Sequence, residues 1–295
     1  MAPSPRPPTE GRRFFISVGE ECNNKADKMI LLLFGSVSKH DDAVDFYQKS
    51  ATEFKIAKSW DQAGPAYIKL AECHLKSGDS HEAAGAYVEA ANCYKKISPL
   101  QAISCLEQGV NLFSNIGRFS MAARHCKEVG ELYEQLRDFG EAIKYFGRAA
   151  DFFQGEAATT SASHCKQKVA LFFAQLKQYT KAIEVFEEVA QEAVNSNLLR
   201  YGVRGHLLNA GVCHLCKGDV VAVTNALSRY QNLDPTFSRT REYELLTDLV
   251  AAYEEQDVEK FTEVLMDYDS LSPLDSWKIV LLLRIKEDLK TKARI

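Results

Sequence analysis

The sequence predicts an all-α protein built from a repeated helical unit. Two observations predict this class: the body of the chain contains few helix breakers, and a small residue recurs at a nearly constant interval. Of the eight prolines, four lie within the first eight residues, which leaves four for the remaining 287. Because proline disrupts a helix interior, so few of them permit many uninterrupted helices.

An alanine followed four residues later by a bulkier side chain recurs eight times. The pairs are Ala43/Tyr47, Ala63/Tyr67, Ala83/Tyr87, Ala102/Leu106, Ala122/Cys126, Ala142/Phe146, Ala162/Lys166 and Ala182/Phe186. Only the seventh pair breaks the rule, because its second member is the charged Lys166. The step between successive alanines is constant except from Ala83 to Ala102, where it is shorter by one. Each interval fits one helix of about four turns and a short turn, so two intervals make an antiparallel helix pair.

Each interval has a helical apolar pattern and ends in a turn signal. Apolar residues between 142 and 153 follow the i, i+3, i+4, i+7 spacing of one helix face. Glycine and polar residues separate the stripes at 77–80, 115–118, 137–140 and 217–219. The dipeptides Ser98-Pro99, Asp234-Pro235 and Ser272-Pro273 each place an N-cap residue before a proline, and we expect a helix to begin at each. Pro65 fits an early position in its helix. About fourteen helices and no strand are predicted.

The repeated alanine also predicts how the helices pack. A small side chain at a fixed position lets neighbouring helices approach closely, and the bulky residue one turn on fills the groove beside it. This is the packing of tetratricopeptide-like (TPR-like) repeats, here with a period of about 40 residues. We therefore expect a right-handed TPR-like solenoid of antiparallel helix pairs with a C-terminal helical bundle. The expected segments are a disordered stretch (1–13), the repeat array (14–233), the bundle (234–290) and a basic tail (291–295).

Composition excludes several classes of function. With 46% hydrophobic residues, 26% charged residues and a net charge of −4, the chain has an ordinary globular composition that implies no nucleic-acid partner. The N-terminus lacks a signal peptide, so we expect the eight cysteines to be reduced and the protein to be cytoplasmic. The longest apolar run, 29–34, is six residues, whereas a membrane span needs roughly 20.

Signals for catalysis are weak. Cys213 and Cys216 have the spacing of a zinc or redox pair, but no second ligand cluster accompanies them. We interpret the cysteines as small packing residues, because Cys73 and Cys93 are themselves one interval apart. No phosphate-binding glycine loop or catalytic triad is present. We expect no enzyme activity, no metal and no cofactor; a metal or thiol enzyme is the least favoured alternative.

Several segments, in order and spacing, resemble one family. They are Phe54 to Gly64, Gly117 to Arg124, Ser161 to Lys168, Leu198 to Tyr201 and Leu274 to Lys286. Across roughly residues 34–290 the chain resembles the alpha-type soluble NSF attachment proteins. The resemblance implies an adaptor for vesicle-mediated transport and membrane fusion, peripherally associated with membranes. Its partners would be the four-helix bundle of syntaxin-type SNAREs, the NSF hexamer that hydrolyses ATP, and the membrane surface.

The resemblance also implies three working surfaces. The SNARE-binding positions are Arg118, Arg124, His164, Lys168, Arg200 and Arg204. The membrane-contact positions are Leu31, Leu32, Leu33 and Phe34, and the NSF-facing positions are Glu254 and Glu255. His164 stands where a lysine is expected, so its contribution would depend on pH. The alternatives are a solvated basic face, packing of the apolar residues within the first helix pair, and a solvated acidic loop.

The C-terminus departs from the family, whose members end in an acidic run and a leucine. From Arg284 onward this chain has five basic and two acidic residues, a local net charge of +3. Because a basic tail would repel the basic surface of NSF, we hypothesise that the chain binds SNARE bundles but stimulates NSF poorly. An altered reading frame at the end of the gene is the mundane alternative. The alternative function is a generic TPR-like scaffold that binds an extended peptide.

Overall fold

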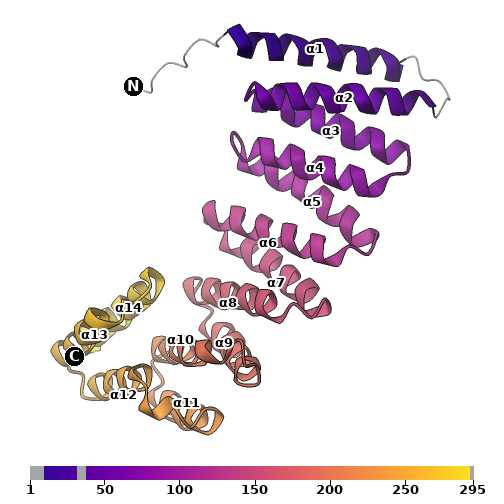
Figure 1. Cartoon of the computed structure of the whole chain (residues 1–295). Helices are drawn as coiled ribbons and strands as arrows, with labels where there is room; N and C mark the ends of the chain where they lie inside the picture. The colour runs from indigo at the N-terminus through magenta and orange to yellow at the C-terminus, as the bar shows by residue number, and fades with distance from the viewer. Residues whose placement is uncertain (1–9, 32–37, 293–295) are drawn as a thin grey trace. The chain divides into compact units, whose positions relative to one another are not determined.

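The computed structural model of the chain describes residues 10–31 and 38–292. Within these ranges the chain forms fourteen α-helices, two short 3-10 helices and no strand, which confirms the predicted class (Figure 1). By the pattern of its contacts the chain divides into two compact units, residues 1–136 and 137–295, and each is considered by itself.

The first unit is an array of helices in which each helix packs against the next in the chain. Successive helices run in opposite directions (Figure 1). The helices are α1 (Glu10–Leu31), α2 (Ser38–Ile56), α3 (Trp60–Lys76), α4 (Ser80–Tyr94), α5 (Pro99–Asn115) and α6 (Phe119–Gln135).

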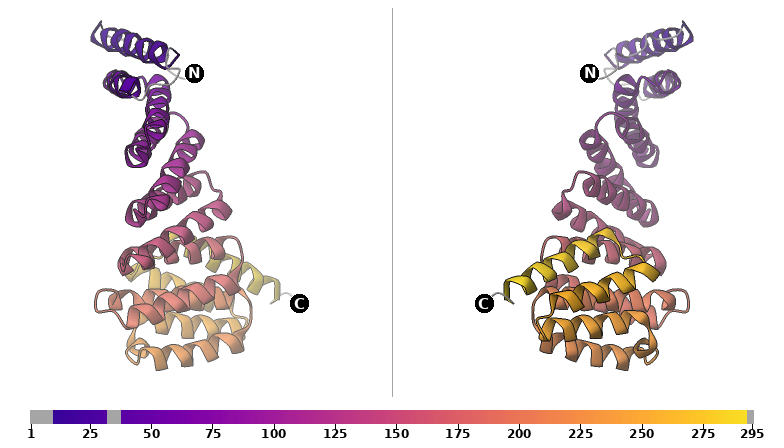
Figure 2. Two further views of the ribbon diagram at one scale, coloured as in Figure 1. Left: turned by 90° about the vertical axis from the view of Figure 1, so that its right-hand side faces the viewer. Right: turned by 90° about the vertical axis from the view of Figure 1, so that its left-hand side faces the viewer.

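The second unit begins in the same way and then changes. Its elements are α7 (Phe139–Gly155), α8 (Thr159–Gln175), α9 (Tyr179–Val194), η1 (Arg200–Gly202), α10 (Val203–Cys216), α11 (Val220–Leu233), η2 (Phe237–Arg239), α12 (Arg241–Glu254), α13 (Val258–Leu271) and α14 (Ser276–Lys292). From α7 to α10 each helix packs on the next, but α10 also contacts α11, α12 and α14. Figure 2 shows α14 lying against the other helices of this unit.

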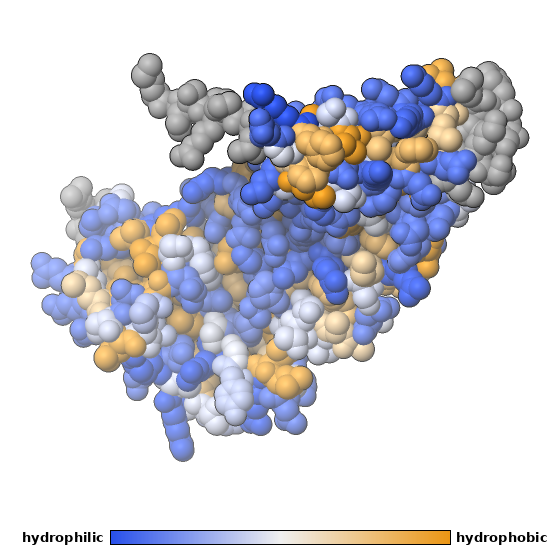
Figure 3. All heavy atoms as spheres, turned by 45° about the horizontal axis from the view of Figure 1, so that its top comes forward, coloured by the Kyte–Doolittle hydropathy of each residue, from blue (hydrophilic) through white to orange (hydrophobic). Residues whose placement is uncertain are grey.

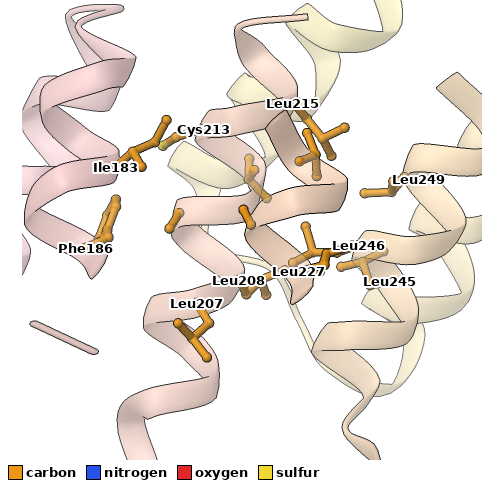
Figure 4. Close-up of a cluster of buried hydrophobic side chains, with 14 of the residues drawn as sticks. Ile183, Phe186, Leu207, Leu208, Cys213, Leu215, Leu227, Leu245, Leu246 and Leu249 are labelled. Carbon is orange, nitrogen blue, oxygen red and sulfur yellow. The ribbon is translucent and has the colours of Figure 1, made fainter. Parts of the chain in front are cut away.

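One apolar core holds the second unit together. Ile183 and Phe186 of α9 face α10, whose own side chains pack on α12 through Leu245, Leu246 and Leu249 (Figure 4). Beside this core, Glu187 of α9 accepts hydrogen bonds from Tyr230 at 2.7 Å and Arg229 at 3.0 Å, both on α11. Although burial opposes it, hydrogen bonding to His214 and Tyr230 lowers the pKa of Glu187 to about 2. The carboxylate therefore ties α9, α10 and α11 together.

The predicted alanine positions are all buried. Seven of the eight have no exposed surface and Ala162 is 4% exposed. The residues one turn on are buried as well, except the half-buried Tyr87 and Lys166. At the position that breaks the rule, the Lys166 ammonium lies 2.8 Å from the carboxylates of both Glu188 and Glu192 on α9. The charge is thus compensated by the next helix in the chain.

The turns repeat with the same interval as the alanines. A residue with positive φ closes the turn at Lys58, Gly78, Gly117, Arg137, Ala157 and Lys177, and only the gap between Gly78 and Gly117 departs from the regular step. Within the described chain, the turn between α4 and α5 has no such residue. It is also the turn crossed by the single shorter alanine interval. Each longer alanine interval therefore contains one residue with positive φ in its turn, and the shorter interval lacks this residue.

The structure corrects several predicted boundaries. Helix α1 begins at Glu10, so 10–13 are helical rather than disordered, and an acidic first residue suits the positive end of the helix dipole. At the other end, α14 runs to Lys292, so the first two residues of the predicted tail, 291–292, are helical. The boundary at 233/234 matches the end of α11, but the core continues across it because α10 contacts helices on both sides.

Only one of the three predicted proline starts is a helix start. Pro99 is the first residue of α5, after Ser98 at the N-cap. Asp234 instead caps the end of α11 and accepts hydrogen bonds from Thr236 in the turn that leads to η2. Residues 273–275 belong to no helix, and α14 starts at residue 276. Those two predictions were wrong because the same dipeptide also suits a turn.

Two glycines in adjacent helices give a matched test of the close packing. A Cβ on Gly64 of α3 would lie 2.7 Å from the Tyr94 ring, whereas a Cβ on Gly85 of α4 would meet nothing within 4 Å. We expect Gly64→Ala to destabilise the protein by about 1–3 kcal/mol through overpacking. Gly85→Ala should stabilise it by about 0.5–1 kcal/mol through helix propensity. Thermal unfolding of the full chain measures both, and melting temperatures that shift in the same direction would contradict this account.

Candidate protein-binding surfaces

The two predicted cations of the first unit lie on α6 and are exposed. Arg118 occupies the N-cap position, and Arg124 lies on the helix six residues further along. Within the part of the chain that the structure describes, neither guanidinium forms an ion pair. Lys127 of the same helix, by contrast, pairs with Glu131 at 3.5 Å. The two arginines therefore present their charge to solvent.

A buried cluster lies behind them. His125 is 7% exposed, stacks on Phe113 at 5.7 Å between centroids, and has its Nδ1 3.2 Å from Glu128. Glu128 also forms an ion pair with Lys95, the residue that caps the C-terminal end of α4. Although burial opposes it, the contacts with His125 and Lys95 lower the pKa of Glu128. Because Lys95 and His125 both contact Glu128, α6 has an inward face whose polar groups are paired and an outward face that carries the charges of the two arginines.

In the second unit, His164 and Lys168 lie one turn apart on α8. His164 is exposed and Lys168 is half-buried, with its ammonium 5.8 Å from the centre of the Phe172 ring. The ring lies within reach of a favourable cation–π contact. Lys168 thus keeps its charge at the surface while part of its side chain is covered.

Arg200 and Arg204 line one groove of the second unit. Its volume is about 590 Å³, and its lining comprises Asn197, Arg200, Tyr201, Arg204, Asp234, Thr236 and Thr240. Arg204 is 61% exposed, with its Nε 3.4 Å from a carboxylate oxygen of Glu242. Arg200 belongs to η1 and Arg204 to α10, so the groove forms where the chain leaves the alanine register.

Two exposed apolar residues belong to the segment that forms this groove: Tyr201 lines it, and Leu198 lies next to the lining residue Asn197 in the sequence, and the sequence analysis missed both as candidates. Leu198 is 80% exposed and Tyr201 is 90% exposed. The sequence feature that could have identified them is the group of apolar residues within 198–201, which follows the last of the repeated alanines. An exposed aromatic beside two cations is the composition of a protein-binding surface rather than of a core.

A buried histidine supports the segment that carries these residues. His206 is 8% exposed, and a Cβ on Gly202 of η1 would lie 3.1 Å from its Nε2. The same nitrogen lies 3.4 Å from the Gln167 amide of α8. Burial, with a smaller effect of Lys278, lowers the pKa of His206 to about 4, so the ring is neutral at pH 7. A glycine at 202 is what lets η1 sit directly on the ring.

The predicted acidic residues lie where α12 turns into α13. Glu254 is the last residue of α12, and both it and Glu255 are exposed. Glu255 pairs with Lys260 at 2.7 Å, and Asp257 caps α13 by accepting from the Lys260 amide. Of the two predicted residues, Glu254 is therefore the one without an ion pair among the described residues.

The predicted membrane-contact residues lie partly outside the described residues. Leu31 ends α1 and is 77% exposed. Leu32, Leu33 and Phe34 lie outside the residues that the structure describes. Among the described helices, none is both long enough and apolar enough to span a bilayer.

The basic C-terminal residues belong to α14 as far as the structure describes them. Lys290 pairs with Glu287 at 2.7 Å, and Arg284 is half-buried beside Tyr179. Arg294 lies outside the described residues. The predicted effect of this charge on NSF stays a prediction.

The cysteines lie in the packed interior. All eight are free; seven are buried and Cys216 is half-buried. Burial raises the pKa of the Cys216 thiol to about 12, which disfavours the reactive thiolate. Among the described residues, no group of three or more His, Cys, Asp or Glu side chains could hold a metal ion.

Known proteins resemble most of the chain. The family model described as soluble NSF attachment protein, SNAP, matches residues 15–290. An alpha-soluble NSF attachment protein of Vitis vinifera is 57% identical over 279 residues, which cover 94% of this chain and 96% of the relative. The alpha-soluble NSF attachment protein of Homo sapiens is 40% identical over 259 residues, 88% of each chain. A solved structure, the apo form of RapI, has a TM-score of 0.45 at 12% identity and covers 96% of this chain and 85% of that chain.

Proposed function

This chain belongs to the soluble NSF attachment protein family, and from that premise we propose that it is an adaptor that joins SNARE complexes to the NSF ATPase during vesicle fusion. The names of its relatives supply the attachment to NSF, and that of a Schizosaccharomyces pombe relative, 36% identical, adds vesicular fusion. The adaptor has no catalytic step of its own in this proposal, because ATP hydrolysis belongs to NSF.

The observation that carries the SNARE-binding part is the outward charge of α6. Arg118 and Arg124 are exposed and unpaired within the described chain, whereas Lys127 of the same helix pairs with Glu131. Exposed like charges do not stabilise a fold, so an acidic partner is what they serve. His164, Lys168, Arg200 and Arg204 extend the set in the second unit.

Charge reversal tests this part. We expect Arg124→Glu combined with Lys168→Glu to weaken co-sedimentation with an assembled SNARE bundle roughly tenfold or more, and more at low salt, because screening weakens exposed charge pairs. Lys96→Glu with Lys217→Glu is the matched control, since it reverses two exposed cations that lie in turns. If both double variants lose SNARE binding equally, net charge alone explains the effect. If neither loses binding, the generic peptide-binding scaffold is favoured.

We further propose that Glu254 and Glu255 face the basic domains of NSF, as the family resemblance implies. Support comes from the exposure of both carboxylates and from the charge of Glu254, which has no ion pair within the described chain. Glu254→Lys should lower the stimulation of NSF ATP hydrolysis severalfold and leave SNARE binding unchanged. Glu184→Lys, an exposed position on α9, is the control. If Glu254→Lys stimulates NSF as well as the unchanged chain does, this turn does not contact NSF.

We propose a membrane contact for the apolar residues 31–34. Its support is the exposure of Leu31 at the end of α1. One such side chain contributes only about 1.5–3 kcal/mol, so several copies on one complex would act together. Leu31→Ser should reduce co-flotation of the adaptor–SNARE complex with phospholipid vesicles; flotation that the substitution does not change would argue against Leu31 as a contact.

A further inference from the structure

An apolar groove runs between α13 and α14 in the second unit. Its volume is about 200 Å³, and its lining comprises Thr262, Leu265, Met266, Asp269, Leu274, Ile279, Leu282, Leu283 and Lys286. The two helices contact one another, and only Leu274 comes from the segment that joins them. Pockets for small ligands usually measure about 300–1,000 Å³, so this groove suits protruding side chains better than a cofactor.

The groove is built from two matching helical rows. Helix α13 contributes residues 262, 265, 266 and 269, and α14 contributes residues 279, 282, 283 and 286. Each row has the i, i+3, i+4, i+7 spacing of a single helix face. Two such faces side by side form ridges between which the side chains of a third helix can insert. The geometry is that of a helix-in-groove site.

The groove is open to solvent although its floor is apolar. Met266 is 68% exposed and Leu283 is 51% exposed, while Leu282 is only 1% exposed and forms the floor. The opposite side of α14 is already used, because Leu281, Ile285 and Leu289 are buried in the core. Figure 3 shows hydrophobic residues at the surface in this region, at the left of the view.

The charged residues beside the groove indicate the charge that a partner must carry. Glu259, Glu263 and Asp267 are exposed and follow the apolar row of α13 at steps of four residues. The basic residue of α13, Lys260, is already paired with Glu255. The α13 side of the groove is therefore acidic, and a partner that covers it must carry positive charge along that side.

We propose that the α13–α14 groove binds an amphipathic helix of a partner protein, with apolar residues facing the groove and Lys or Arg along the edge that faces α13. This site is separate from the Glu254 turn and does not rest on the proposed function. Because the acidic residues lie along the α13 side of the groove only, they determine which edge of the bound helix must carry the positive charge.

A synthetic peptide tests the proposal on the full chain. The probe is a labelled 18-residue helix-forming peptide with leucines at i, i+3, i+4, i+7 and lysines along one flank, and the control peptide has the same composition in scrambled order. We expect saturable binding by fluorescence anisotropy, at least about tenfold tighter for the patterned peptide. Met266→Glu and Leu283→Glu should each weaken it by about tenfold or more. Val221→Glu, an equally exposed apolar position on α11 (71% exposed), should leave it unchanged.

A charge-reversal experiment distinguishes binding at this site from nonspecific hydrophobic binding. Glu263→Lys with Asp267→Lys should weaken the lysine-flanked peptide and strengthen a glutamate-flanked version. Absence of saturable binding, or binding that Met266→Glu and Leu283→Glu do not change, would overturn the proposal. It would also be overturned by a dimer in sedimentation equilibrium that Leu283→Glu abolishes, which would make a second copy the occupant. Vesicle flotation that Leu283→Glu abolishes would make a membrane the occupant.

Discussion

The close approach of helices at a buried alanine is the constraint on which the rest of the structure depends. At eight positions a residue larger than alanine would separate two packed helices, and each of these alanines is at most 4% exposed. Because the interval is nearly constant, the helices α2 to α6 of the first unit and α7 to α9 of the second present the alanine-bearing face to helices of their own unit. The turns repeat with it, and the one shorter interval matches the one turn from α2 to α9 without a left-handed residue.

The same register decides which cations are available to a partner. Positions that point inward along α6 hold His125 against Glu128, and the irregular Lys166 of α8 is held by two carboxylates of α9. Arg118 and Arg124 lie off the packed face and stay exposed. Where the register ends, after α9, the chain forms η1 and the groove that Arg200 and Arg204 line. Helix geometry therefore determines the exposure of the candidate residues along α6, and the irregular segment after α9 positions Arg200 and Arg204.

Prediction from the sequence was accurate wherever one repeat determined the structure. The alanine positions, the number of helices and the turn positions all follow from local spacing. The start of α1, the end of α14 and the two misassigned proline sites did not follow, because helix ends depend on caps and tertiary contacts. The segment η1, which carries Tyr201, lies on a buried histidine beneath Gly202, a contact between elements that no local pattern reveals. The α13–α14 groove likewise required knowing which side of α14 the core uses.

The central claim is that this helical array is an adaptor that couples SNARE bundles to NSF. Its most direct test is a reconstituted disassembly reaction with purified NSF, ATP, a fluorescently labelled SNARE bundle and this chain as the only adaptor. The account predicts ATP-dependent disassembly that requires the chain, that is slowed by its basic C-terminus, and that is lost when Arg124 and Lys168 are both reversed to glutamate. Absence of disassembly when the chain is present and bound to the bundle would contradict it.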